Sequence, residues 1–148
     1  MARAERRTQG DLPDVNVWLA LLNAQHPHHS SAKHYWEHAA EQHIAFCRIT
    51  MLGLLRLSTN KVVMGGTPYT SEQAWQAYQT VTNLPEVGFA SEPTGIEIAM
   101  QKYTRGAQFR QADWTDTYLA AFAQLAGLRI VSFDKGFARY SDLPHLVL

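Results

Sequence analysis

The alternation of short apolar runs with longer amphipathic segments constrains the fold of this chain most. Apolar runs lead into Asp14, cover 44–47 and 87–89, and recur most clearly at 128–133. Runs of about four to eight apolar residues favour strands, and the segments between them show helical periodicity. Because parallel strands need long crossover connections, this order predicts an α/β fold with a short, mainly parallel central sheet.

The helices that we expect follow the apolar periodicity of the sequence. After a first helix that begins next to Asp14, they cover 31–42, 49–57, 72–84, 95–103 and 115–126. We expect N-caps at Ser30 or Ser31, Thr70 or Ser71, Thr94 and Thr115, and a C-cap at Gly127. The segment 134–136, DKG, is expected to be a turn.

Composition limits the classes of protein and partner. The 148 residues suit one domain, 11–148, and the polar segment 1–10 is expected to be a mobile arm. Thirteen basic and 13 acidic residues cancel, which excludes nucleic-acid binding through bulk charge. The single cysteine, Cys47, excludes an intrachain disulfide and a cysteine-rich zinc site. With neither a signal peptide nor a long apolar segment, we expect a cytoplasmic protein and no membrane contact.

Three aspartates are expected at one end of the predicted sheet. Asp14 follows the first strand, Asp134 follows strand 128–133, and Asp116 lies in the first turn of the helix before that strand. Ligands of open α/β sheets bind at the carboxyl ends of the strands. Clustered carboxylates repel one another unless a cation lies between them, and oxygen ligands favour Mg²⁺ or Mn²⁺. Such a site suits phosphodiester hydrolysis.

Each aspartate also has a purely structural interpretation. Asp14 could cap the helix that begins near Asn16, Asp116 could favour a helix N-terminus, and Asp134 could start a turn. Spacing alone leaves the structural and the functional interpretations open.

Three segments, in this order, resemble a known family. DVNVWLAL (14–21), TDTYLAAFA (115–123) and SFDKGF (132–137) are similar to segments of PIN-domain ribonucleases, above all the VapC-type toxins of bacterial toxin–antitoxin pairs. The resemblance covers about residues 11–140. It implies a PIN-like three-layer α/β/α fold and a metal-dependent endoribonuclease that cleaves tRNA or another structured RNA.

The resemblance also implies roles for individual residues and partners. Asp14, Asp116 and Asp134 match the catalytic and metal-binding aspartates, with Mg²⁺ or Mn²⁺ as cofactor. Supporting positions are matched by Asn16, Ser132 and Thr115, the last of which could orient Asp116 or a metal-bound water. The expected partners are the RNA substrate, a VapB-type antitoxin and a second copy of the chain.

One position departs from the family pattern. Gly53 stands roughly where the family commonly carries a glutamate, so a second metal ion is in doubt. Asp113 or Glu97 could replace that ligand, or both could be exposed charges that flank helices. The missing glutamate motivates an alternative hypothesis, a degenerate PIN domain that binds RNA or an antitoxin without cutting.

Basic and aromatic side chains offer further contacts to RNA. Arg48, Arg56, Lys135 and Arg139 could hold phosphates or simply be exposed. The four tryptophans could stack on bases, but their helical spacing favours core or dimer contacts for all except Trp114, which neighbours the acidic site.

Overall fold

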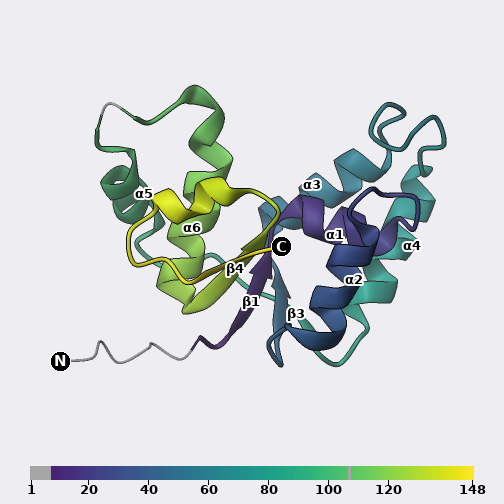
Figure 1. The fold of residues 1–148 in the computed structure, drawn as a ribbon, viewed down its shortest axis with the longest axis horizontal. Coiled ribbons are helices and arrows are strands. Elements are labelled where there is room, and N and C mark those ends of the chain that lie inside the picture. Colours follow the sequence, from purple (N-terminus) through teal and green to yellow (C-terminus); the bar gives the residue numbers. More distant parts are fainter. Residues whose placement is uncertain (1–7, 107) are drawn as a thin grey trace.

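A computed structural model describes residues 8–106 and 108–148, and these residues form five strands and six α-helices (Figure 1). The strands are β1 (Gly10–Pro13), β2 (Ile44–Phe46), β3 (Val87–Phe89), β4 (Leu128–Ser132) and β5 (His145–Val147). The helices are α1 (Val15–Leu22), α2 (His29–His38), α3 (Arg48–Ser58), α4 (Ser71–Thr82), α5 (Ile96–Thr104) and α6 (Trp114–Ala126). Two short 3₁₀ helices, Gln111–Asp113 and Lys135–Arg139, flank α6 and β4.

All strand pairs in the sheet are parallel, in the order β3-β2-β1-β4-β5. The α/β prediction is therefore confirmed, whereas β5 was not expected. The central position of β1 matters for the site. Pro13 lies opposite Val131 in the register of β1 and β4, so Asp14 and Ser132 follow at the same edge.

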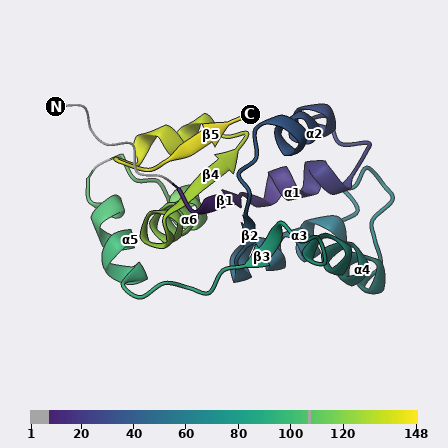
Figure 2. The same cartoon turned by 90° about the horizontal axis from the view of Figure 1, so that it is seen from below.

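Helices cover both faces of the sheet, which gives the expected three layers. Helices α5 and α6 lie on one side and α1 to α4 on the other (Figures 1 and 2). Leu12 and Ile130 pack with Phe122 of α6 in the first core. In the second core, the ring of Trp18 stacks on Phe46 with 3.9 Å between the ring centroids. These two cores fix the helices that border the carboxyl edge of the sheet.

The first strand begins inside the segment expected to be an arm. Gly10 opens β1, and the amide of Gln9 donates to the carbonyl of Gly127 at 2.8 Å. Thr8 donates a side-chain hydrogen bond to Glu41 at 3.3 Å. Residues 1–7 of the expected arm lie outside the described residues.

Two of the expected helix caps are confirmed. Thr70 caps α4 by accepting the amide hydrogen of Gln73, whose side chain accepts the Thr70 amide hydrogen in return. Gly127 ends α6 in the left-handed conformation, with φ of 69°, which a residue without Cβ adopts at little cost.

Other expected boundaries are wrong. Helix α2 begins after His28 and ends at His38, so Ser30 and Ser31 lie inside it. Gly95, not Thr94, precedes α5. Thr115 is in the first turn of α6, because the preceding 3₁₀ helix leads directly into Trp114. The segment after Asp134 also coils into a 3₁₀ helix, which Asp134 caps, in place of a simple turn.

A buried ion pair lies between the two central strands. The Asp11 carboxylate is fully buried and accepts hydrogen bonds from the Arg129 guanidinium at 2.7 and 3.0 Å. The Tyr35 hydroxyl and the Glu41 amide donate to the same carboxylate at 2.6 and 3.0 Å. Since buried charges are tolerated only when they are paired and hydrogen-bonded, this cluster holds β1, β4 and α2 together. No described helix is long and apolar enough to cross a membrane.

Candidate active site

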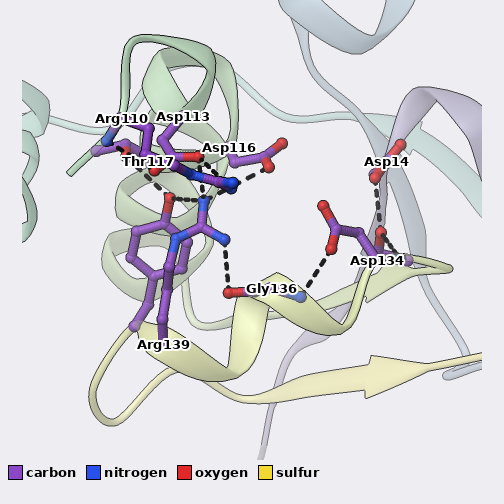
Figure 3. Close-up of polar contacts among 10 residues, drawn as sticks. Asp14, Arg110, Asp113, Asp116, Thr117, Asp134, Gly136 and Arg139 are labelled. Carbon is purple, nitrogen blue, oxygen red and sulfur yellow. Dashed lines mark hydrogen bonds and ion pairs between the residues drawn. The ribbon is translucent and has the colours of Figure 1, made fainter. Parts of the chain in front are cut away.

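Asp14 directly follows β1 and serves as the N-cap of α1. Its carboxylate accepts the Asn16 amide hydrogen at 2.9 Å and the Ser132 hydroxyl hydrogen at 2.7 Å (Figure 3). Its own amide donates to the Val131 carbonyl at 2.9 Å. Asp14 is therefore both a cap and a member of the site, so the two interpretations of this residue are compatible.

Ser132, the last residue of β4, connects two of the aspartates. Its hydroxyl donates to Asp14 and accepts the amide hydrogen of Asp134 at 2.9 Å. The Asp134 carboxylate in turn accepts the Gly136 amide hydrogen at 2.7 Å. One hydroxyl thus fixes the position of Asp134 relative to Asp14 across the edge of the sheet.

Asp116 approaches the same place from the first turn of α6. Its carboxylate lies 3.6 Å from a guanidinium nitrogen of Arg139, and 27% of its side chain is exposed. In Figure 3 the Asp14, Asp116 and Asp134 carboxylates project into one space from three different elements.

These side chains line an open pocket of about 730 Å³. The predicted site residues among its lining are Asp14, Asn16, Thr115, Asp116, Ser132 and Asp134. Gly53 and Arg56 of α3 line it as well. The structure therefore brings together all the predicted site residues except the two proposed substitutes for the missing glutamate, Asp113 and Glu97.

Burial and the crowding of negative charge in this pocket raise the pKa of two carboxyl groups. Burial raises the pKa of Asp14, and the Asp134 charge raises it further, against the opposing effect of the hydrogen bonds from Ser132 and Asn16. Burial and the charges of Asp14 and Asp134 raise the pKa of Asp116, and Arg139 only partly offsets them. A carboxyl pKa rises in this way when no nearby cation fully balances the negative charge.

The donor set fits a hard divalent cation. Carboxylate oxygens are the ligands that Mg²⁺ and Mn²⁺ favour, and a cation would relieve the repulsion that raises the pKa of Asp116. The described residues contain no group of three or more His, Cys, Asp or Glu side chains already arranged as a metal site. Asp14, Asp116 and Asp134 are the residues that would hold the ion.

Neither proposed substitute for the missing glutamate reaches the pocket. Asp113 is buried, not an exposed flanking charge, and its carboxylate accepts from the Arg110 amide at 3.0 Å and pairs with Arg110 and Arg139 at 3.1 and 3.2 Å. These contacts lower its pKa, the backbone hydrogen bond most. Glu97 is exposed in the first turn of α5 and is not among the residues that line the pocket.

Arg139 has a structural role that the sequence did not reveal. Its guanidinium donates to the Gly136 carbonyl at 2.7 Å and the Tyr140 hydroxyl at 2.8 Å, besides its ion pairs with Asp113 and Asp116. The side chain is thus committed to the protein, and it is not a free phosphate ligand. The five-residue separation from Asp134 was the only sequence signal for its proximity to the site.

Gly53 permits the close approach of α3 to α1. A Cβ atom at position 53 would lie 2.5 Å from one methyl group of Val15, a separation that real Cβ atoms do not tolerate. Val15 is the residue next to Asp14. The absence of a glutamate here is therefore coupled to the packing that holds the first aspartate.

A model of the PIN domain matches residues 12–143. The chain belongs to the PIN-domain family. It is 35% identical over 137 residues to ribonuclease VapC41 of Mycobacterium tuberculosis, covering 89% of this chain and 94% of that relative. It is 30% identical over 128 residues to ribonuclease VapC39 of the same organism, covering 86% and 90%.

Two solved structures show that the architecture of this PIN domain is shared. VapC20 of M. tuberculosis, described as a sarcin-ricin loop cleaving toxin, has a TM-score of 0.64 at 16% identity, covering 86% of this chain and 92% of its own. VapBC2 from Rickettsia felis, bound to a DNA fragment from its promoter, has a TM-score of 0.64 at 13% identity, covering 93% and 97%. At these identities the likeness establishes the PIN-like fold alone.

Proposed function

We propose that this PIN domain is a metal-dependent endoribonuclease that acts as a toxin and is neutralised by a VapB-type antitoxin. The observation that carries the proposal is the convergence of Asp14, Asp116 and Asp134 on one pocket, where the pKa values of Asp14 and Asp116 are raised. Two relatives at 30% identity or more are ribonucleases. We further propose that the protein acts on RNA in the cytoplasm and assembles as a homodimer.

The protein's own contribution to hydrolysis is the placement of its carboxylates. Bound Mg²⁺ or Mn²⁺ would supply polarisation of the phosphodiester and activation of water. Ser132 and Asn16 hold the Asp14 carboxylate in a fixed orientation, and the Gly136 amide does the same for Asp134. Thr115 lines the pocket beside Asp116, where we assign it a supporting role.

The decisive test is cleavage of total cellular RNA by purified, antitoxin-free protein in the presence of Mn²⁺ or EDTA. We expect discrete fragments with Mn²⁺ and none with EDTA. Asp14→Asn removes a charge from the metal ligands and should lower the cleavage rate by more than about 100-fold while circular dichroism shows a retained fold. Glu72→Gln, at an exposed position of α4 outside the pocket, is the matched control and should cleave like the wild type.

The second candidate is a PIN domain that binds RNA or an antitoxin without cutting, and Gly53 favours it because α3 offers no carboxylate at that position. This candidate predicts RNA binding that persists in EDTA, no fragments with any metal, and no toxicity on expression. Cleavage that depends on Asp14 and metal would exclude it, whereas an active Asp14→Asn protein would contradict the proposed site.

A further inference from the structure

We propose that Arg56 and Trp75 form a binding site for the nucleotide next to the cleaved phosphodiester, with its phosphate on Arg56 and its base on Trp75. This inference rests on the proposed function and extends it to substrate positioning. It starts from a second hollow, of about 270 Å³, that adjoins the carboxylate pocket and is lined by Leu55, Arg56, Thr59, Ser71, Ala74 and Trp75.

Arg56 belongs to both hollows. It lines the carboxylate pocket together with Leu52 and Gly53, and it lines the second hollow together with Leu55 and Thr59. Residues four apart share a helix face. Leu52 and Arg56 therefore lie on one face along α3, and Leu55 and Thr59 lie on the adjacent face. Arg56 is therefore the residue at which the two hollows meet, and a ligand that extends from one to the other passes it.

Among the residues that the structure describes, Arg56 is also the only basic one that lines either hollow. It is exposed, and no hydrogen bond or ion pair joins its guanidinium to another residue in 8–106 or 108–148. By contrast, Arg139 is held by its ion pairs and Arg48 lies over the Phe89 ring at 4.5 Å. Since the chain has no net charge and the pocket is acidic, a polyanion needs such a local cation.

Trp75 supplies the aromatic surface of the second hollow. Its side chain belongs to α4 and is 46% exposed, whereas Trp18 is fully buried. The Trp75 indole packs edge to face with the ring of Tyr78, with 6.1 Å between the ring centroids and 74° between the ring planes. This contact restricts the orientation of an exposed indole. A fixed aromatic ring beside a cation is the usual combination for binding single-stranded nucleic acid without sequence preference.

The proposal can be tested by binding, independently of cleavage. A short fluorescent single-stranded RNA is titrated with the full chain in EDTA, and anisotropy is followed at several salt concentrations. Arg56→Gln should weaken binding and reduce the slope of log K against log salt by about 0.7, the value for one phosphate contact on a single strand. Trp75→Leu should weaken binding about tenfold with an unchanged slope, because stacking does not release counterions.

Two variants outside both hollows are matched controls. Arg105→Gln removes an exposed arginine after α5, and Phe89→Leu removes an aromatic ring that is 43% exposed. Both should retain the affinity and the salt slope of the wild type. Equal losses in the hollow variants and the controls would overturn the proposal, because they would indicate diffuse contacts. Wild-type affinity in both Arg56→Gln and Trp75→Leu would also overturn the proposal. It would favour a protein partner as the occupant of the second hollow.

Failure of this inference can be distinguished from failure of the proposed function. If the wild type cleaves RNA and both Arg56→Gln and Trp75→Leu bind RNA normally, the proposed ribonuclease function is supported and the subsite is refuted. If the wild type neither binds nor cleaves RNA, both fall. Thermal unfolding of each variant, followed by circular dichroism, separates lost binding from a lost fold.

Discussion

Asp116 is the site residue whose negative charge most clearly lowers the stability of the metal-free protein. Its carboxylate faces Asp14 and Asp134, and its pKa is raised mainly by burial and then by those two charges. The ion pair with Arg139 at 3.6 Å opposes this effect without cancelling it. Keeping this side chain ionised therefore destabilises the fold at neutral pH, as is common where function requires like charges to lie together.

We predict that Asp116→Asn stabilises the metal-free protein at neutral pH. The neutral side chain removes the repulsion, so the free energy of unfolding should rise by about 1 kcal/mol, or roughly 2–4 °C in the melting temperature. Differential scanning calorimetry in EDTA measures this change. A lower melting temperature in Asp116→Asn would show that the pairing with Arg139 outweighs the repulsion.

The same raised pKa fixes the sign of a pH dependence. As pH falls through the raised pKa, the folded wild type takes up a proton before the unfolded chain does, so its stability increases relative to the variant. The advantage of Asp116→Asn should therefore be largest above the raised pKa and should shrink toward the ordinary value of 3.8. Melting curves of both proteins across this range provide the measurement, and a gap that widens on acidification would contradict it.

At the residue scale, the sequence was sufficient to place the three aspartates together, because the ends of parallel strands share one edge with the start of the helix that precedes β4. It was insufficient for Arg139 and Asp113. Whether a charge is exposed or paired depends on the path of the loop between 104 and 114 and of the 3₁₀ helix after β4, and neither segment has a periodic pattern to read.

At the scale of elements, the contact between α1 and α3 decides how Asp14 is held. Val15 begins α1 and faces Gly53 in the middle of α3. Val15 is β-branched and has little rotamer freedom in a helix. A side chain at position 53 must therefore displace Val15, and with it the neighbouring aspartate.

We predict that Gly53→Ala destabilises the protein and lowers RNA cleavage. Overpacking typically costs about 1–3 kcal/mol, which exceeds the gain of roughly 1 kcal/mol from replacing glycine in a helix. In a Val15→Ala background the clash is gone, so the same substitution should be neutral or stabilising. Urea unfolding of the four proteins of this cycle gives the interaction energy, and additive effects would show that the two residues do not touch.

Helix boundaries show where local sequence rules suffice. Thr70 was one of the two caps expected for α4, and it forms a reciprocal cap with Gln73. Helix α2 starts without any side-chain cap, three residues after His26. Tertiary packing of Tyr35 against the Asp11 cluster defines that helix, and no rule about neighbouring residues reports such packing.

At the scale of the whole molecule, the Asp11 cluster is a polar link between β1 and β4, which lie far apart in the sequence. Arg129 binds Asp11, which lies 118 positions away in the sequence. Its guanidinium also donates to the Ala39 carbonyl at 2.8 Å. Pairing over such a separation leaves no signal in a single sequence, so the contact between Asp11 and Arg129 could not be predicted.

We predict that Arg129→Gln is strongly destabilising although it is not a site residue. It leaves the Asp11 carboxylate buried without its counter-charge, which typically costs about 3–5 kcal/mol. Urea unfolding measures the loss. Asp11→Asn together with Arg129→Gln should cost less than the sum of the two single changes, since the double variant has no unpaired charge; a strictly additive result would contradict the pairing.

The central position of β1 also has a consequence for synthesis of the protein. Asp14 leaves the ribosome before β4 is made, so it has no Ser132 or Asp134 to face until translation has passed β4, because the sheet joins the first strand to the fourth. A nascent chain therefore carries no assembled site until β4 has emerged. If the protein attacks RNA as proposed, the ribosome that makes it is not exposed to the finished site before that point.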